Sequence, residues 1–301
     1  MDGDVMQEKT AVITGSTGGI GKEIARGLAM RGASVILVGL DPVEGRQAMT
    51  ELRRDAGHDR IEALVADVTT LDGLAKLASQ IAERTDQLDV LVNNVGVNPP
   101  ARQLTADGVE KTFAAHVLAP FTLTRLLLPQ LRQAGSARIV NVTGGIPGGP
   151  IERDNLQAEK RFMGWTFSQY NHTKTMTMAM THRLATELSG TGVCVNVVYP
   201  GHGYTPMNRS TSIKAFPKLY RPIAPLVLKV IAPLFLADLA RSARPSVYLA
   251  SSPEVEGITG AYFDSSCRHR PWPASVLDPR NRNAVWDLCT SLSPQSVGGK
   301  A

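Results

Sequence analysis

Tyr170 and Lys174, a tyrosine and a lysine four positions apart, are the first candidates for chemistry in this sequence. Residues four apart lie on one face of a helix, so a helix through this segment brings the phenol and the ammonium together. A nearby cation favours the phenolate and is expected to lower the pKa of the tyrosine. Such a phenol can exchange a proton with the oxygen of an alcohol or a ketone. The pair therefore predicts Tyr170 as a general acid and base that Lys174 tunes.

A glycine-rich turn near the start of the chain is a candidate site for a phosphate-bearing cofactor. It follows the apolar run at residues 10–14 and reads TGSTGGIG over residues 14–21. Glycines allow the backbone to turn tightly and approach a pyrophosphate, and the helix that follows offers its N-terminal N–H groups to the anion. The spacing is TGxxxGxG rather than the more common GxGxxG.

Three further motifs follow this turn in order. They are DV at residues 67–68, NNVG at residues 93–96 and PGHGYT at residues 200–205. Together with TGxxxGxG and YxxxK, they resemble the ordered motifs of the short-chain dehydrogenase/reductase family over nearly the whole chain. The segments TGSTGGIGKEIA, ERDNLQAEK and VYLASSPEVEGITGAYF and the pair Cys267-Arg268 are similar to the branch that contains the retinol dehydrogenases.

The resemblance implies a nicotinamide dinucleotide as the cofactor. It implies that Asp67 holds the adenine amino group, that residues 93–96 close the fourth strand against the cofactor, and that residues 200–205 lie near the nicotinamide amide. It also implies that Lys174 holds the ribose hydroxyls. The residues expected to bind the cofactor are Gly15, Ser16, Thr17, Gly19, Ile20, Gly21, Leu40, Asp67, Val68, Asn94, Gly96, Tyr170, Lys174, Pro200, Gly201 and Thr205.

The serine of the family's catalytic group is absent. Residues 138–144, RIVNVTG, align with the family's IVNVSS, and the serine that binds the substrate oxygen there is Gly144 here. Loss of one such donor costs a factor of about 10² to 10³ in rate. Thr143 is the nearest replacement, but adjacent side chains on a strand point to opposite faces. Thr143 can serve only if the chain shifts register at the strand end; a widened pocket floor is the alternative.

His116, in a predicted helix over residues 110–128, replaces the family's catalytic asparagine. A histidine can transfer protons or can be an inert helix residue. Pro120 lacks an N–H, so the carbonyl of residue 116 is expected to have no helical partner and to be free to hold a water. In the family, this carbonyl helps to order a water beside the lysine. Tyr170, Lys174, His116 and Thr143 are thus the candidate catalytic residues.

The end of the second predicted strand decides between the two nicotinamide cofactors. An acid there accepts the ribose hydroxyls of NAD(H) and repels the extra phosphate of NADP(H). That position is Gly39, and Leu40 replaces the basic residue of NADP-using relatives. The missing acid favours NADP(H), with Arg46 or Lys22 as phosphate ligands; Asp41 on the ribose would reverse this preference.

Short apolar runs alternate with helix-length segments to position these motifs. The predicted strands are residues 10–14, 34–39, 61–66, 88–93, 138–143, 193–199 and 260–263. This alternation predicts an α/β protein, a single-domain Rossmann-type doubly wound parallel sheet over residues 1–301.

The composition favours a cytoplasmic enzyme. Hydrophobic residues make up 43% and charged residues 20%, which is ordinary for a soluble enzyme, and the first ten residues are too polar for a signal peptide. Cys194, Cys267 and Cys289 are odd in number and widely spaced, which argues against disulfides and metal sites. The net charge is +5, but the basic residues are spread out, so nucleic acid is not an expected partner.

Two segments lie outside the motifs. Residues 222–238 are apolar but short and interrupted by Lys229, so they are assigned, within 206–245, to a lid over an apolar substrate. Packing on a second subunit and peripheral membrane contact are alternatives. Residues 268–301, rich in Pro, Arg and Asn, are expected to form a C-terminal surface tail.

The helix that bears YxxxK often builds dimers and tetramers in the family. Four apolar residues on it could supply such contacts: Met176, Met178, Met180 and Leu184. Core packing is the plainer explanation of this run.

The sequence thus predicts a cytoplasmic reductase or dehydrogenase that uses NADP(H) and acts on a sizeable apolar ketone or alcohol. Hydride passes between the cofactor and the carbonyl carbon, and Tyr170 moves the proton. Because the serine and the asparagine are both replaced, the alternative is a non-redox catalyst, such as a cyclase or dehydratase, or a cofactor-sensing protein on the same fold.

Overall fold

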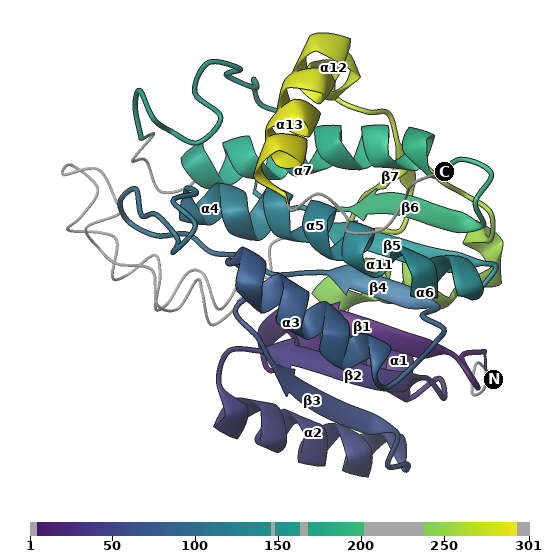
Figure 1. The fold of residues 1–301 in the computed structure, drawn as a ribbon. Helices are drawn as coiled ribbons and strands as arrows, with labels where there is room; N and C mark the ends of the chain where they lie inside the picture. Colours follow the sequence, from purple (N-terminus) through teal and green to yellow (C-terminus); the bar gives the residue numbers. More distant parts are fainter. Residues whose placement is uncertain (1–4, 146–147, 163–167, 202–237, 294–301) are drawn as a thin grey trace.

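The computed structural model describes residues 5–145, 148–162, 168–201 and 238–293, which form an α/β sandwich around one sheet (Figure 1). The sheet has the order β3-β2-β1-β4-β5-β6-β7-β8, and every pair is parallel except β7 with β8. The strands are β1 (Thr10–Thr14), β2 (Ser34–Gly39), β3 (Ile61–Val65), β4 (Val90–Asn93), β5 (Ala137–Val142), β6 (Val193–Val198), β7 (Tyr262–Phe263) and β8 (His269–Arg270). The predicted doubly wound sheet is confirmed, and the predicted strands agree to within two residues at each end.

The strand order reverses between β1 and β4, and open α/β sheets bind ligands at such a point, beyond the carboxyl ends of the strands. The glycine-rich turn follows β1 there, and the NNVG segment follows β4. The fold therefore brings these predicted motifs together at the carboxyl ends of the central strands, the edge of the sheet at which ligands bind.

Helices cover both faces of the sheet. Their bounds are α1 (Gly19–Ala29), α2 (Pro42–Ala56), α3 (Leu71–Ala82), α4 (Lys111–Phe113), the π-helix η1 (Ala114–Leu118), α5 (Ala119–Leu126), α6 (Leu128–Gln133), α7 (Ser168–Glu187), α11 (Leu239–Ser251), the short 3₁₀ helix η5 (Pro253–Val255), α12 (Ala274–Leu277) and α13 (Pro279–Leu292). One apolar core joins α3, α5, α7 and α13 to the sheet, and the other joins α1, α2 and α11 to the opposite face. The sheet is thus buried on both sides, as its nearly continuous apolar strands require.

Helix α7 is long and almost wholly enclosed. Met176, Met178 and Met180 are fully buried within the chain, and Leu184 is nearly so. Core packing therefore accounts for this methionine run, as the plainer interpretation held. Helices α12 and α13 lie against α7 (Figure 1). The oligomeric state stays a prediction.

The C-terminal segment is built into the core. Val285 and Cys289, one turn apart on α13, are fully buried in the cluster that contains Met176. The guanidinium of Arg183 on α7 lies 4.8 Å from the ring centroid of Trp286. The predicted surface tail is therefore wrong for residues 268–293, because α13 has an apolar face that needs a partner; residues 294–301 lie outside the described residues.

The predicted lid falls mostly outside the described residues, which resume at Asp238. Residues 239–245 begin α11, where Ser242, Ala243 and Pro245 are buried and the helix packs against α1. This last part of the predicted lid is scaffold, so the assignment is wrong there. Within the described residues, no helix is both long enough and apolar enough to cross a membrane.

Removing methyl groups from the inner face of α13 should destabilise the whole protein. We expect Val285→Ala to lower the free energy of unfolding by about 2 kcal/mol, because it leaves a cavity in the core. Thr290→Ala, at an exposed position of the same helix, is the matched control and should change it by less than about 0.5 kcal/mol. Urea denaturation measures both, and an equal, small effect of the two variants would show that α13 is not part of the core.

Candidate active site

Glycines shape the turn after β1 through both backbone conformation and close contact. Gly15 has a φ of +64°, a left-handed conformation that favours glycine. A β-carbon on Gly21 would lie 2.1 Å from the carbonyl oxygen of Gly15 and 2.5 Å from the amide nitrogen of Asn94, so no larger residue fits there. The turn leads directly into α1, whose first N–H groups are available to an anion. A pyrophosphate fits this cradle.

Two predicted cofactor ligands instead hold the turn in place. The buried Ser16 hydroxyl donates to the carbonyl of Ile13 (2.7 Å) and accepts from the N–H of Val38 (3.0 Å). The Asn94 side-chain amide donates to the carbonyls of Thr14 and Gly15, both at 3.1 Å. Their side chains tie the turn to β2 and to the end of β4, so they shape the cofactor cradle rather than face outward from it.

The YxxxK pair lies beside this turn. Tyr170 and Lys174 are both at least nine-tenths buried on α7. The Lys174 ammonium donates to the carbonyl of Val142, at the end of β5, at 2.9 Å, and it lies 3.5 Å from the carbonyl of Val95. A β-carbon on Gly15 would touch Val95 at 3.1 Å. The ends of β1, β4 and β5 thus converge on the pair.

Burial sets the charge states of the pair. Removal from water lowers the pKa of Lys174 to about 7 and raises the pKa of Tyr170 to about 12. The expectation that Lys174 lowers the pKa of Tyr170 is wrong for the cofactor-free chain. Its ammonium lies 5.8 Å from the phenol ring centroid and faces backbone carbonyls, so desolvation of the phenolate dominates. Tyr170 is therefore a neutral phenol and a proton donor.

His116 lies within the π-helix and is fully buried behind the tyrosine ring. Its Nε2 accepts the N–H of Val97 at 3.0 Å, and its Nδ1 lies 2.7 Å from the hydroxyl of Thr173. That hydroxyl donates to a backbone carbonyl of α7, at Gln169 or Tyr170, so it accepts from Nδ1–H. Burial, and next the charge of Lys174, hold the His116 pKa well below its usual value. His116 is thus a neutral link between the β4 loop and α7.

The backbone carbonyl of His116 has a partner. The Thr177 hydroxyl lies within donating distance of it, at 2.8 Å. The expectation that this carbonyl is free is wrong, because α7 packs directly against the π-helix and brings a hydroxyl within donating distance. That the carbonyl has no partner within its own helix stays a prediction.

The two residues at the end of β5 face opposite ways. The Thr143 hydroxyl donates to the carbonyl of Lys174 at 3.3 Å, on the buried side of α7. A β-carbon on Gly144, by contrast, would lie 2.6 Å from the Tyr170 hydroxyl oxygen. The structure therefore places Gly144, and not the Thr143 side chain, against the phenol of Tyr170.

The end of β2 has no acid, and Thr17 fills the space. A β-carbon on Gly39 would lie 2.3 Å from the Thr17 methyl carbon. The Thr17 hydroxyl is 3.5 Å from a carboxylate oxygen of Glu44, in the first turn of α2. Asp41 caps α2 by accepting the N–H of Val43 at 2.6 Å. Glu44 is an acid near the predicted ribose site that sequence reasoning missed; its place in an exposed helix turn gave no signal.

The basic candidates near this point differ. Lys22 is paired with Glu51 at 2.9 Å, in a network that includes Arg26. The Arg46 guanidinium on α2 has no hydrogen bond or ion pair within the described part of the chain. Arg46 is therefore the freer of the two cations.

The other predicted cofactor ligands lie along the same edge or outside the described residues. Asp67 is exposed after β3, and one of its carboxylate oxygens accepts from Thr69. Leu40 is 68% exposed after β2. The remaining described positions, by burial, are Gly19, Ile20 and Gly201 partly buried, Val68 and Pro200 buried, and Gly96 exposed. Thr205 lies outside the described residues.

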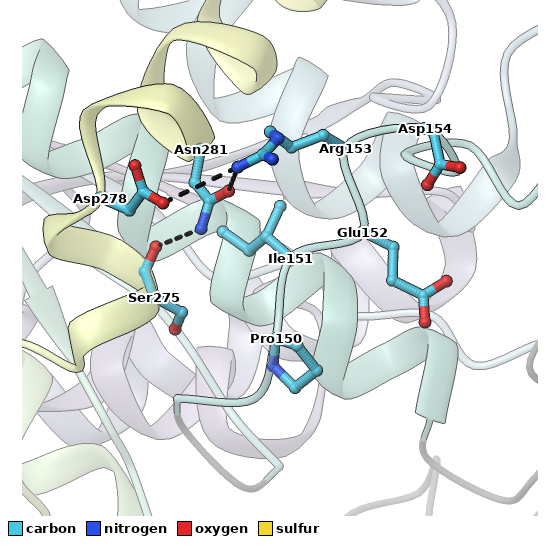
Figure 2. Close-up of a pocket in the computed structure, with 8 residues that line it drawn as sticks. All are labelled: Pro150, Ile151, Glu152, Arg153, Asp154, Ser275, Asp278 and Asn281. Atoms are coloured by element: carbon cyan, nitrogen blue, oxygen red, sulfur yellow. Dashed lines mark hydrogen bonds and ion pairs between the residues drawn. The ribbon is translucent and has the colours of Figure 1, made fainter.

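A hollow of about 460 Å³ lies between the loop after β5 and helices α12 and α13 (Figure 2). Arg153 points across it to Asn281 (3.2 Å) and Asp278 (3.7 Å). Glu152 and Asp154 are paired with basic residues of their own loop. Its charges compensate one another, so this hollow joins two segments and offers no unpaired charge to a ligand.

Comparisons with known proteins agree with this geometry. The family model described as short chain dehydrogenase matches residues 9–215. Human retinol dehydrogenase 14 is 32% identical, over 95% of this chain and 87% of that protein. Human retinol dehydrogenase 12 is 34% identical, over 94% of this chain and 86% of that protein.

Solved structures show the same fold. The Pseudomonas aeruginosa RhlG/NADP active-site complex has a TM-score of 0.65 and 26% identity, covering 88% of this chain and 97% of that one. An uncharacterised protein from Mycobacterium paratuberculosis has a TM-score of 0.71 at 24% identity, covering 95% and 93%. With the glycine turn, the ordered motifs and the buried YxxxK pair in one place, the chain belongs to the short chain dehydrogenase family and is an NAD(P)-dependent oxidoreductase.

Proposed function

We propose that this protein transfers hydride between NADP(H) and a lipophilic ketone or alcohol, with Tyr170 as the general acid and base. The observation that carries the proposal is the buried Tyr170–Lys174 pair at the ends of β4 and β5, next to the glycine turn. Perturbed titratable groups gathered at a ligand-binding edge are typical of catalytic sites.

The bound cofactor supplies or accepts the hydride, and the chain supplies the proton chemistry. In reduction, the neutral Tyr170 phenol donates its proton to the carbonyl oxygen as negative charge develops there. Lys174, with a pKa of about 7, changes charge near neutral pH, and we assign to it the task of holding the ribose hydroxyls. His116 and Asn94 fix the loop after β4, against which the cofactor would lie. A glycine at 144 leaves no serine donor for the substrate oxygen, so the phenol carries that task.

A lipophilic substrate is supported by relatives and by composition. Several of the similar proteins are named as retinol dehydrogenases, and retinol is a long apolar alcohol. The sequence also carries an apolar stretch at residues 222–238, most of which lies outside the described residues. All-trans-retinal is therefore a suitable first probe. The cytoplasmic location stays a prediction.

The preference for NADP(H) is supported by three features of the chain and its neighbours. Gly39 removes the acid that would repel a 2′-phosphate, and Arg46 is a cation without a described partner. The RhlG structure, at 26% identity, is an NADP complex. Glu44 opposes this preference through its negative charge near Thr17.

Removing the Tyr170 hydroxyl should separate catalysis from binding. We expect Tyr170→Phe to lower NADPH-dependent reduction of all-trans-retinal by about 10² to 10⁴, the usual contribution of a positioned proton donor. The NADPH dissociation constant, measured by calorimetry, should change little. Tyr248→Phe, on α11, removes a hydroxyl that donates to Glu254 of η5; it is the control and should keep full activity. A Tyr170→Phe protein that turns over normally would refute the proposal, and binding without turnover in the unaltered chain would favour the cofactor-sensing alternative.

The two charged residues on α2 should tune the choice of cofactor in opposite directions. We expect Arg46→Ala to weaken NADPH binding by about fivefold relative to NADH, because an exposed charge contact is worth up to about 1 kcal/mol. We expect Glu44→Gln to strengthen the binding of NADPH relative to that of NADH. Lys22→Ala is the control, because Glu51 already pairs with that ammonium. Calorimetric titration with both cofactors gives the ratios, and an unaltered NADPH/NADH ratio in both α2 variants would count against this assignment.

The buried lysine should make stability depend on pH. Between a folded pKa of about 7 and the ordinary value of 10.5, the unfolded chain carries a proton on Lys174 that the folded chain lacks. Stability therefore rises with pH in this window, at about 1.4 kcal/mol per pH unit, and the gain is lost as pH falls to 7. Lys174→Met removes this contribution of Lys174 to the pH dependence of stability.

Urea denaturation at pH 7 and pH 9 measures the effect. The free energy of unfolding of the unaltered protein should rise between the two by about 2 kcal/mol more than that of Lys174→Met. Lys76→Met, on the exposed face of α3, is the control and should behave as the unaltered protein does. Parallel pH curves for Lys174→Met and the unaltered protein would show that the ammonium is not buried.

A further inference from the structure

The phenol of Tyr170 occupies volume that any side chain at position 144 would need. A β-carbon built on Gly144 would lie 2.6 Å from the hydroxyl oxygen and 3.3 and 3.4 Å from two ring carbons. A contact of 2.6 Å is shorter than carbon and oxygen atoms tolerate without one of them moving. Gly144 is not among the residues with positive φ, so its backbone conformation does not demand glycine. The absence of a side chain at position 144 thus leaves room for the Tyr170 hydroxyl.

The ring of Tyr170 has little room to retreat. The His116 ring meets it edge to face, with centroids 4.9 Å apart, and both nitrogens of that histidine are held by hydrogen bonds. On the side of the β4 loop, a β-carbon on Gly96 would lie 3.7 Å from the hydroxyl oxygen. The phenol oxygen therefore lies in a slot between two glycines, at the ends of β4 and β5, with a fixed histidine beside the ring.

We propose that Gly144 is a positioning residue, whose lack of a side chain sets the Tyr170 hydroxyl at the end of β5. This inference rests on the function proposed above and deepens it. The phenol oxygen takes the place that a side chain from the strand would fill, so one hydroxyl both binds the substrate oxygen and delivers the proton. The absent serine is then not a defect to be repaired: a side chain put back at 144 displaces the proton donor.

The test compares three single variants in NADPH-dependent reduction of all-trans-retinal. We expect Gly144→Ala and Gly144→Ser both to lower kcat by about 10²-fold, the effect of displacing a reacting group by about 1 Å. The NADPH dissociation constant should stay within about twofold, because the glycine turn is untouched. Gly149→Ala, in the same loop with nothing within 4 Å of an added β-carbon, is the matched control and should keep the activity of the unaltered protein. A rise in kcat in Gly144→Ser would overturn the proposal, since it would show that a serine hydroxyl fits beside the phenol.

A second measurement needs no substrate. In protein labelled with 3-fluorotyrosine, the fluorine signal that disappears in Tyr170→Phe belongs to Tyr170. We expect Gly144→Ala to shift this signal and Gly149→Ala to leave it in place. An unshifted signal in Gly144→Ala overturns the contact itself. A shifted signal with full retinal turnover in Tyr170→Phe would instead contradict the proposed function and leave the contact standing.

Discussion

The burial of one ammonium group against the ends of two strands is the constraint on which the rest of the site depends. Lys174 donates to the carbonyl of Val142, the last residue of β5. Its ammonium also approaches the carbonyl of Val95, in the loop just after β4. An ammonium taken from water requires such partners, and here the partners are backbone atoms. These contacts therefore fix the position of helix α7 along the strands and its rotation about its own axis. Tyr170, one turn earlier, is carried to the cofactor edge by the same constraint.

A layer of neutral hydrogen bonds maintains this arrangement. His116 joins the N–H of Val97 to Thr173 of α7, and Asn94 joins the loop after β4 to the glycine turn. These links are buried or partly buried and join uncharged groups, so they hold position without competing for the proton on the phenol. Residues that the motifs first suggest as ligands, Ser16 and Asn94, belong to this layer. The site is thus held by hydrogen bonds where it orients Tyr170.

The sequence predicted those features that depend on local rules. The glycine turn, the alternation of strands and the YxxxK spacing each need only neighbouring residues, and the structure has all three where expected. The charge state of Tyr170 was mispredicted, because it depends on how much water α7 and the strand ends exclude, which spacing does not show. The role of Thr143 was left open, because it depends on the direction in which one side chain points at a strand end.

The prediction of a surface tail failed at helix α13 for a different reason. Asp278 and Pro279 form an N-terminal cap, and Val285, Leu288, Cys289 and Leu292 have helical spacing. The many Pro, Arg and Asn residues around them hid this pattern. Glu44 could not be found at all from the sequence, because its approach to Thr17 depends on how α2 lies beside the glycine turn.

The central claim is that the glycine turn, the ends of β4 and β5, and the Tyr170–Lys174 pair form one cofactor-dependent site. A crystal structure of the NADPH complex tests it most directly. The account predicts the pyrophosphate on the turn after β1, the nicotinamide beside the Tyr170 hydroxyl, and a ribose hydroxyl within hydrogen-bond reach of Lys174. A cofactor bound elsewhere, or a Tyr170 hydroxyl turned away from the nicotinamide, would contradict it.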